Sequence, residues 1–493
     1  MVPRDGMRLF LYDSASRGNV PFAPADPERV RIYTCGPTVY RYAHIGNLRT
    51  YLLTDLLVRT LRFLGYGTFA VQNITDMGHM HQEQLEAGED KVIAAARAAG
   101  KSGREIARFF TEAFFRDCGR MAFLPADAYP RASEHVPEMI ALVSALEERG
   151  AVYGEGGYLY FDVTKAPGYG IFSGARLGEG EAAKRTDETI HRHKKRPEDF
   201  TLWMPAEPDR EFRWESRWGA GWPGWHMECA AMAIRHLGPE FDLHVGGADL
   251  RFSHHENSRA VAMTATGKKF AALWLHAANL RIDGKKMSKS AGNEYTLDDL
   301  VSRPRSGGNG YSPEDFRYYC LTLHHSSPMN FTWDGQEAAA RARSRLQAAF
   351  RRAARKGTSG EDAAAAWRAE FRDAVSDDLN MPRALAVAHK AVRPGIGGDV
   401  ARALAMEWDA VLGVGLLPEA GDDREATGIR EGEPEGIPPV VEAMARERET
   451  RRRARDYPAA DALREKIRTA GYDVVDAAEG TPVLRKMQGT LER

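Results

Sequence analysis

The chain has 493 residues, of which 43% are hydrophobic and 28% are charged. That length allows two to four domains with sizeable cores, and that balance is ordinary for a globular protein. The net charge of −1 excludes a globally basic nucleic-acid binder, so any contact with nucleic acid has to use a local patch.

Membrane insertion and secretion are not expected from this sequence. No apolar run reaches the roughly 18 residues that a spanning helix needs, and the N-terminus lacks the apolar centre of a signal peptide. The four cysteines, Cys35, Cys118, Cys229 and Cys320, are too scattered for a disulfide framework. We therefore expect a protein of the reducing cytoplasm that binds no membrane.

Residues 1–27 predict a first strand followed by a Pro-rich segment. The first clear elements after them have the order strand, turn, helix, strand. Residues 30–35 alternate apolar and polar side chains, leucines share one face of a helix over residues 47–65, and residues 68–74 predict the next strand. This order predicts an α/β fold with a doubly wound, parallel, Rossmann-like sheet. Ligands bind such sheets at the carboxyl ends of the strands, where Cys35 and His44 would lie.

The remaining elements follow from periodicity and composition. The predicted elements, in chain order, are helices over residues 88–150 with a loop at 124–133, strands at 158–163 and 241–245, a helix near His254, a loop at 303–312, long helices at 335–416, a flexible linker at 418–438 and a helical segment at 440–470.

A loop rich in lysine follows residues 280–283. Lys285-Lys286-Met287-Ser288-Lys289-Ser290 places three lysines and two serines within six residues, with Gly284 before them and Ala291-Gly292 after. Lysine supplies a mobile point charge for phosphate, and glycine lets the backbone bend close to a ligand. The loop therefore suits a triphosphate, and the alternative is a solvated basic loop.

Two polar residues stand at the start of the first predicted helix. His44 and Asn47 lie where a helix offers unpaired N–H groups and the positive end of its dipole, which together form an anion site. The alternative is that both side chains merely cap the helix.

The segment Cys35–Asn47 (CGPTVYRYAHIGN) and the lysine loop together resemble the HIGH and KMSKS signatures of class I aminoacyl-tRNA synthetases, most closely the cysteinyl-tRNA synthetase family. The resemblance implies ATP-dependent attachment of L-cysteine to its tRNA through a cysteinyl-adenylate, with Mg²⁺ on the phosphates, by a monomeric enzyme. The last HIGH position is Asn47, which can donate a hydrogen bond but carries no charge.

The resemblance also implies particular site residues. It assigns catalysis to His44, Asn47, Lys286 and Lys289. It assigns ATP binding to Pro37, His44, Gly46, Asn47, Gly246, Gly247, Asp249, Lys286, Met287, Ser288, Lys289 and Ser290. It assigns cysteine binding to Cys35, Thr75, Trp225 and His244.

The family holds Zn²⁺, and the resemblance implies Cys35, Cys229 and His254 as its ligands here. The family's fourth ligand is a glutamate four residues after the histidine, but this chain has Ser258 there, which is a poor zinc ligand. Glu256, water or the substrate are left as alternatives for the fourth position. Without the resemblance, buried structural cysteines would be the simpler interpretation.

Two regions suggest RNA binding. Residues 341–356 carry seven basic side chains and no acidic one, so they either contact phosphates or form a solvated helix face. Residues 380–385 (NMPRAL) resemble the signature of the family's anticodon-binding helical bundle, and residues 456–464 match its C-terminal region. No role is assigned to His79 and His81, for which a solvated surface position is the default.

The resemblance divides the chain as follows: a class I catalytic domain at 1–302 with an insertion at about 116–225, a connecting region at 303–334, the helical bundle at 335–416, a linker at 417–438 and a small tRNA-binding region at 439–493. Two other functions stay open. One is an ATP-dependent cysteine ligase with a non-tRNA amine acceptor, against which the helical bundle argues. The other is a catalytically impaired tRNA-binding paralogue, against which His44 and the lysine loop argue.

Overall fold

The structure is a computed structural model. It describes residues 8–77, 80–82, 87–155, 157–174, 193–287, 292–305, 310–355, 361–392 and 396–417, and beyond these only short pieces, including the hairpin of β16 (Tyr472–Val475) and β17 (Val483–Lys486). The chain forms two compact units, Met1–Pro418 and Glu419–Arg493. Among the described residues, no helix is both long and apolar enough to cross a bilayer.

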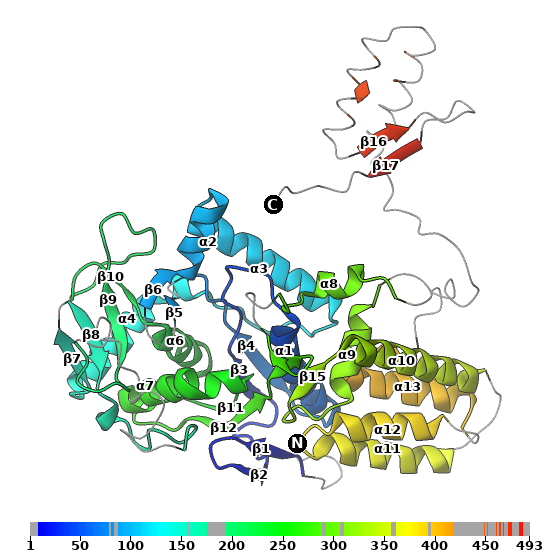
Figure 1. Cartoon of the computed structure of the whole chain (residues 1–493). Coiled ribbons are helices and arrows are strands. Elements are labelled where there is room, and N and C mark those ends of the chain that lie inside the picture. Colours follow the sequence, from blue (N-terminus) through cyan, green and yellow to red (C-terminus); the bar gives the residue numbers. More distant parts are fainter. Residues whose placement is uncertain are drawn as a thin grey trace. The chain divides into compact units, whose positions relative to one another are not determined.

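A four-stranded parallel sheet lies at the centre of the first unit (Figure 1). Its order is β12 (Phe270–Ala277), β11 (Glu240–Gly247), β3 (Val30–Thr34) and β4 (Thr68–Gln72). Helix α1 (Ile45–Phe63) connects β3 to β4, as the strand–turn–helix–strand pattern predicts. The predicted α/β class and parallel sheet are confirmed.

Helices cover this sheet. Figure 1 shows the sheet between α1 and α6 (Trp225–Leu237), and α7 (Glu256–Thr266) packs on β12. Helix α4 (Val136–Glu148) packs behind α6 and α7. The strands are buried almost throughout, and in β11 this burial includes the polar side chains of Asp242 and His244, which alternate with apolar ones.

The region inserted between β4 and α6 contains two helices, α2 (Lys91–Ala99) and α3 (Gly103–Arg120), and an antiparallel sheet. The order in that sheet is β10 (Gly221–Pro223), β9 (Phe200–Pro205), β8 (Tyr158–Phe161) and β7 (Val152–Glu155). Only β8 follows from the sequence pattern. The short hairpin of β5 (Met80–Gln82) and β6 (Ala87–Asp90) also belongs here.

Smaller elements complete the unit. They are the hairpin of β1 (Phe10–Asp13) and β2 (Gly18–Pro21), the three-stranded sheet of β14 (Lys285–Lys286), β13 (Leu280–Ile282) and β15 (Met329–Phe331), and the helices α8 (Leu297–Ser302) and α9 (Pro313–Leu321). The predicted long helices follow as α10 (Trp333–Ala354), α11 (Glu361–Ser376), α12 (Met381–Ala391) and α13 (Gly398–Leu412).

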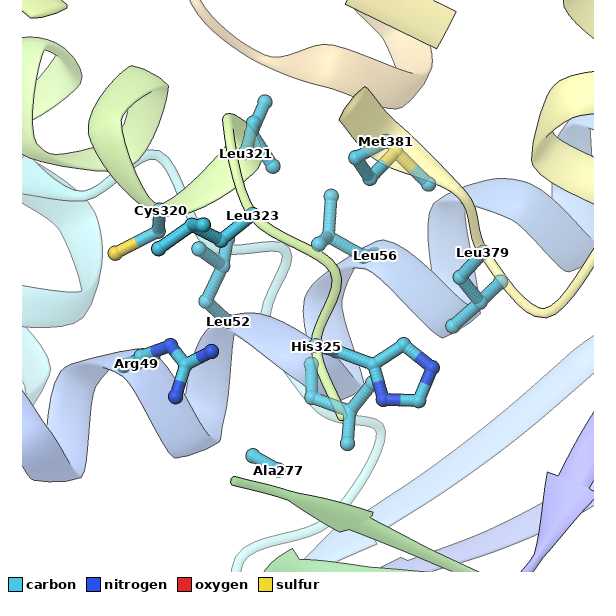
Figure 2. Close-up of a pocket in the computed structure, with 11 residues that line it drawn as sticks. Arg49, Leu52, Leu56, Ala277, Cys320, Leu321, Leu323, His325, Leu379 and Met381 are labelled. Atoms are coloured by element: carbon cyan, nitrogen blue, oxygen red, sulfur yellow. The ribbon is translucent and has the colours of Figure 1, made fainter. Parts of the chain in front are cut away.

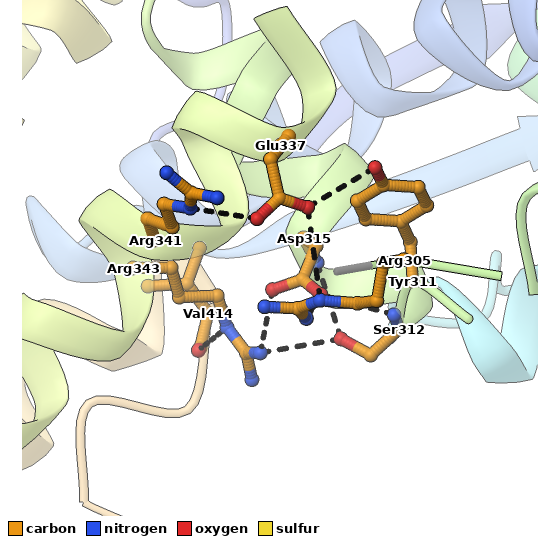
Figure 3. Close-up of polar contacts among 8 residues, drawn as sticks. All are labelled: Arg305, Tyr311, Ser312, Asp315, Glu337, Arg341, Arg343 and Val414. Carbon is orange, nitrogen blue, oxygen red and sulfur yellow. Dashed lines mark hydrogen bonds and ion pairs between the residues drawn. The ribbon is translucent and has the colours of Figure 1, made fainter. Parts of the chain in front are cut away.

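Polar contacts fasten the helical bundle to the segment before it (Figure 3). The carboxylate of Asp315, only 3% exposed, caps α9 through Ser312 and accepts a hydrogen bond from Arg343 of α10 at 3.1 Å. Arg343 also donates to the carbonyl of Val414, which follows α13, at 2.7 Å. One guanidinium thus joins three segments, and it is not available to a partner.

A second guanidinium connects the bundle to the central sheet's helix. Arg317 of α9 is wholly buried, lies 2.5 Å from the carboxylate of Asp55 on α1, and donates to the carbonyl of Leu412 at 2.6 Å. Burial lowers the pKa of this guanidinium, and Asp55 opposes that shift. Because both charges are removed from water, loss of Asp55 would leave Arg317 unpaired, and loss of Arg317 would leave Asp55 with Arg59 as its remaining cation at 2.9 Å.

We therefore predict that Arg317→Met lowers the free energy of unfolding of the first unit by about 3–5 kcal/mol, measured by chemical denaturation. The control is Arg341→Ala, which removes an ion pair with Glu337 whose arginine side chain is 58% exposed, and which should cost less than about 1 kcal/mol. Equal, small effects of the two substitutions would show that the buried pair does not fasten the bundle.

Candidate active site

A cavity of about 740 Å³ opens at the carboxyl ends of β3, β4 and β11. Most of the predicted site residues line it, although they come from distant parts of the sequence. Those residues are Cys35, Pro37, His44, Gly46, Asn47, Thr75, Trp225, Cys229, Gly247, Asp249, His254, Lys286 and Met287.

The N-terminus of α1 faces this cavity. His44 and Asn47 form a reciprocal capping box, in which His44 Nδ1 accepts from the backbone N–H of Asn47 at 3.1 Å and Asn47 Oδ1 accepts from that of His44 at 3.2 Å. Burial and the nearby Arg41 lower the pKa of His44 to about 4, so the ring is neutral at pH 7 and carries its proton on Nε2. The ring N–H and the Asn47 amide are therefore both donors that a ligand can use.

The lysine loop reaches the same helix end. Lys286 lies at the end of β14, and Met287 approaches Gly46 so closely that a Cβ there would lie 3.0 Å from Met287 Cε and 3.0 Å from His44 Nδ1. A side chain at Gly46 would thus separate the loop from the helix. Ser288, Lys289 and Ser290 lie outside the described residues, so their predicted role in ATP binding stays a prediction.

Three soft donors meet at the base of the cavity. The Sγ atoms of Cys35 and Cys229 are 3.7 Å apart, and His254 Nε2 lies 3.3 Å from Cys229 Sγ. All three ligand atoms lie within 4.8 Å of one another, and all three side chains are buried. Two thiols and an imidazole at this spacing fit a tetrahedral Zn²⁺ with one position left over.

Protonation of the two thiols differs. Burial raises the pKa of the Cys35 thiol, whereas the hydrogen bond from Cys35 and the proximity of His254 lower that of Cys229. One sulfur is thus already biased towards the thiolate that a metal requires.

The residue at the family's fourth ligand position is turned elsewhere. Ser258 is wholly buried, and its hydroxyl donates to the carbonyl of His226 at 3.2 Å. Glu256 accepts from the backbone N–H of Phe172 at 2.8 Å and lies 3.7 Å from Arg259, so it does not join the Cys–His group either. Neither side chain would thus supply a fourth ligand, and Cys35, Cys229 and His254 all line the cavity.

A layer of imidazoles lies beneath the donors. His244 is wholly buried and stacks on Trp274, with ring centroids 4.3 Å apart. His255 links Cys35 Sγ (3.2 Å) to His276 Nε2 (2.7 Å). Burial lowers the pKa of all three rings, so they are neutral and add no positive charge beside the donors. His244, predicted to contact the substrate, has a ring nitrogen within 4.8 Å of Cys35 Sγ but is not among the residues that line the cavity, so its predicted role stays a prediction.

Two residues that were not predicted, Asn73 and Glu228, connect to the predicted Thr75 at the edge of the cavity. Asn73 accepts from the backbone N–H of Gly36 at 2.9 Å and donates to Thr75 Oγ1 at 3.0 Å, and Thr75 donates to Glu228 at 3.2 Å. Each was visible as a polar residue inside an apolar run, but only the packing of β4 on α6 makes them neighbours.

The predicted RNA-binding residues are described in part. Within α10, Arg345, Arg352 and Arg355 are exposed, whereas Arg341 and Arg343 have the intramolecular partners given above. Asn380 caps α12 by accepting from the N–H of Arg383. His79 and most of residues 456–464 lie outside the described residues, as does the side chain of His81.

Comparison with known proteins identifies this arrangement. Residues 21–341 match the family model of the tRNA synthetases class I (C) catalytic domain. The chain is 39% identical to the "Cysteine--tRNA ligase" of Thermus thermophilus over 96% of this chain and 98% of that one, and 39% identical to "Cysteine--tRNA ligase 1" of Burkholderia lata over 99% of each. The corresponding protein of Treponema denticola is 35% identical over 96% and 99%.

Solved structures support the fold. A Mycobacterium tuberculosis methionyl-tRNA synthetase in complex with methionyl-adenylate superimposes with a TM-score of 0.55 at 15% identity, covering 79% of this chain and 92% of that one.

The serine at position 258 gives a test of the metal site. We predict that Ser258→Glu slows loss of zinc during dialysis against a mild chelator by about tenfold, because the carboxylate adds a fourth protein ligand. Ser258→Gln is the matched control, since it has the same size without the charge. Equal rates of zinc loss from the wild type and from Ser258→Glu would refute a ligand position at residue 258.

Proposed function

We propose that this chain, which belongs to the cysteinyl-tRNA synthetases within class I, joins L-cysteine to its tRNA at the expense of ATP. ATP and cysteine form cysteinyl-adenylate and pyrophosphate, and the terminal ribose hydroxyl of the tRNA then attacks the adenylate's carbonyl carbon. AMP leaves, and no protein nucleophile is needed.

One observation carries the proposal: a Cys–Cys–His donor group and an anion-binding helix end line a single cavity. The donor group suits the thiol end of cysteine, and the helix end suits the phosphates of ATP. The resident ion we propose is Zn²⁺ held by Cys35, Cys229 and His254. When bound, it supplies a soft Lewis acid that takes the substrate's thiolate, a bond that serine cannot form.

The chain's own residues perform the transfer by positioning and by electrostatics. The neutral ring of His44 and the amide of Asn47 donate to phosphate oxygens, together with the first N–H groups of α1. Lys286 and Lys289 hold the pyrophosphate as it departs, with Mg²⁺ on the same oxygens. Trp225, whose ring stacks on His254 with centroids 4.0 Å apart, closes over the bound amino acid and excludes water.

Partners and location follow from the same assignment. We propose that the exposed arginines of α10 and the unit Glu419–Arg493 contact the tRNA, and that the enzyme works as a monomer in the cytoplasm. The four free cysteines agree with a reducing compartment.

The two alternatives have less support. A ligase with a non-tRNA amine acceptor would not need the helices α10–α13, yet the likeness to the cysteine–tRNA ligases covers 96–99% of this chain. An impaired paralogue would be expected to lose catalytic groups, whereas His44, Asn47 and Lys286 line the cavity.

We predict that Lys286→Ala slows cysteine-dependent exchange of pyrophosphate into ATP by about 10²–10³-fold, because this ammonium stabilises charge that develops on the leaving group. Lys285→Ala is the matched control. Lys285 precedes Lys286 in β14 and does not line the cavity, so its removal should leave the rate within about threefold. Equal rates for the two variants would refute the assignment.

We also predict that deletion of Glu419–Arg493, the second compact unit, lowers kcat/KM for tRNA charging by about tenfold or more and leaves pyrophosphate exchange nearly unchanged. The helices α10–α13 are kept in this variant because Arg317 and Arg343 bind them to the rest of the first unit. If both activities fall together in a truncated protein that is folded by circular dichroism, the second unit has no separate role in tRNA binding.

A further inference from the structure

A second group of metal-ligating side chains lies outside the active site, where three segments of the first unit meet. His324 and His325 occupy the turn between α9 and β15, and Asp378 lies in the turn between α11 and α12. The third segment is β1, because the backbone N–H of Tyr12 donates to Asp378 Oδ1 at 2.8 Å. Neither the site chemistry nor the tRNA surface uses these residues.

The spacing of the donor atoms fits a metal ion. His324 Nε2 lies 3.6 Å from Asp378 Oδ2, His325 Nε2 lies 3.4 Å from Asp378 Oδ1, and all the ligand atoms lie within 4.8 Å of one another. Ligands about 2.0–2.1 Å from a tetrahedral ion stand about 3.3 Å apart, so small side-chain rotations suffice to close the site.

Both imidazoles aim the same nitrogen at Asp378. Each Nε2 also lies within hydrogen-bond distance of the Asp378 carbonyl oxygen, at 2.8 Å from His324 and 3.1 Å from His325. The turn that carries both histidines is held by two further hydrogen bonds. The carbonyl of His325 accepts from Ala278 N–H at 2.8 Å, and that of Ser327 accepts from Arg49 at 2.7 Å.

Hydrogen bonding orients the ring of His324 but does not select a tautomer of His325. His324 Nδ1 lies 2.7 Å from the hydroxyl of Ser326, the kind of contact that fixes a metal-bound imidazole from behind. His325 Nδ1 is buried without a hydrogen-bond partner among the described residues, so nothing there fixes its proton.

Access and charge also suit a cation. The His324 side chain is 23% exposed, which leaves a path from solvent, whereas His325 and Asp378 are 7% and 8% exposed. Figure 2 shows His325 beside Leu379 at the margin of an apolar pocket lined by Leu52, Leu56, Leu321, Leu323 and Met381. The apolar pocket hinders the approach of water from that side. A bound ion would therefore have apolar side chains on one side and the partly exposed His324 on the other.

We propose that His324, His325 and Asp378 form a second, structural site for a divalent transition metal such as Zn²⁺, which fastens the α11–α12 turn and β1 to the turn after α9. Two imidazoles and a carboxylate are ligands typical of zinc, and the fourth position is open to water or to the Asp378 carbonyl. Because such an ion binds only the folded arrangement, it stabilises the joint by mass action.

The experiment measures the zinc content of two full-length proteins, the wild type and the Cys229→Ser variant. The substitution removes a ligand of the proposed active-site metal. After dialysis against buffered free Zn²⁺, the wild type should contain two equivalents and the Cys229→Ser protein one. Adding His324→Gln and His325→Gln should abolish the remaining equivalent, together with the zinc-dependent rise in Tm of the Cys229→Ser protein. A folded Cys229→Ser protein without zinc, or an unchanged count in the triple variant, would overturn the proposal.

A matched control removes another close histidine pair. His135 and His236, whose Nε2 atoms are 2.9 Å apart, do not belong to any three-ligand group among the described residues. Replacing both with glutamine in the Cys229→Ser background should leave one equivalent in place, and loss of that equivalent would overturn the assignment to His324 and His325. Should the triple variant fail to fold, anomalous scattering at the zinc edge from wild-type crystals decides, since a peak between His324, His325 and Asp378 is required.

Discussion

The site depends on the parallel alignment of β3 and β11. This alignment places the thiol of Cys35 at the same edge of the sheet as the other two donor residues. Cys35 ends β3, Cys229 lies 194 positions later on α6, and His254 follows β11. In a parallel sheet all carboxyl ends share one edge, so these donors converge although no short spacing connects them. Because the β3 end also leads into α1, the same constraint sets the donor group and the anion-binding helix end in one cavity.

Low polarity at the base of the cavity is the second property of this arrangement. The donor atoms rest on neutral, buried imidazoles, and low polarity there raises the cost of any unpaired charge. In the proposed mechanism, a Zn²⁺ ion held by two sulfur ligands would compensate for this low polarity, and a substrate thiolate would complete its ligands. An alcohol lacks both the charge and the softness. On that proposal, discrimination between cysteine and serine is a property of the base of the cavity and does not require a finely shaped pocket.

The sequence predicted the elements whose signals are local. The alternation of residues 30–35, the leucine face of α1 and the helix start at His44 correspond to observed elements. The antiparallel strands β9 and β10 were missed because they pair with each other and with β8 across the insertion, and β7 was missed because it has only four residues, although it forms a hairpin with the neighbouring β8. A pairing between distant segments leaves no periodic trace in either one.

The site was predictable to the same extent. The resemblance named the donors Cys35, Cys229 and His254, and the geometry brings them together, but only the fold shows Ser258 turned towards His226 and Glu256 engaged with Phe172. His244 was expected to contact the substrate, and since it is not among the residues that line the cavity, that role stays a prediction. In the sequence, Arg343 is one of the basic residues that suggest RNA binding. In the structure its guanidinium is hydrogen-bonded to Asp315.

The most direct test of the central claim is cysteine-dependent pyrophosphate exchange by the wild-type protein as a function of its measured zinc content. Protein stripped of metal and shown to remain folded should lose activity, and zinc added back should restore both the exchange rate and the preference for cysteine over serine. Protein containing less than about one zinc per ten chains that still activates cysteine at the original rate would contradict the account.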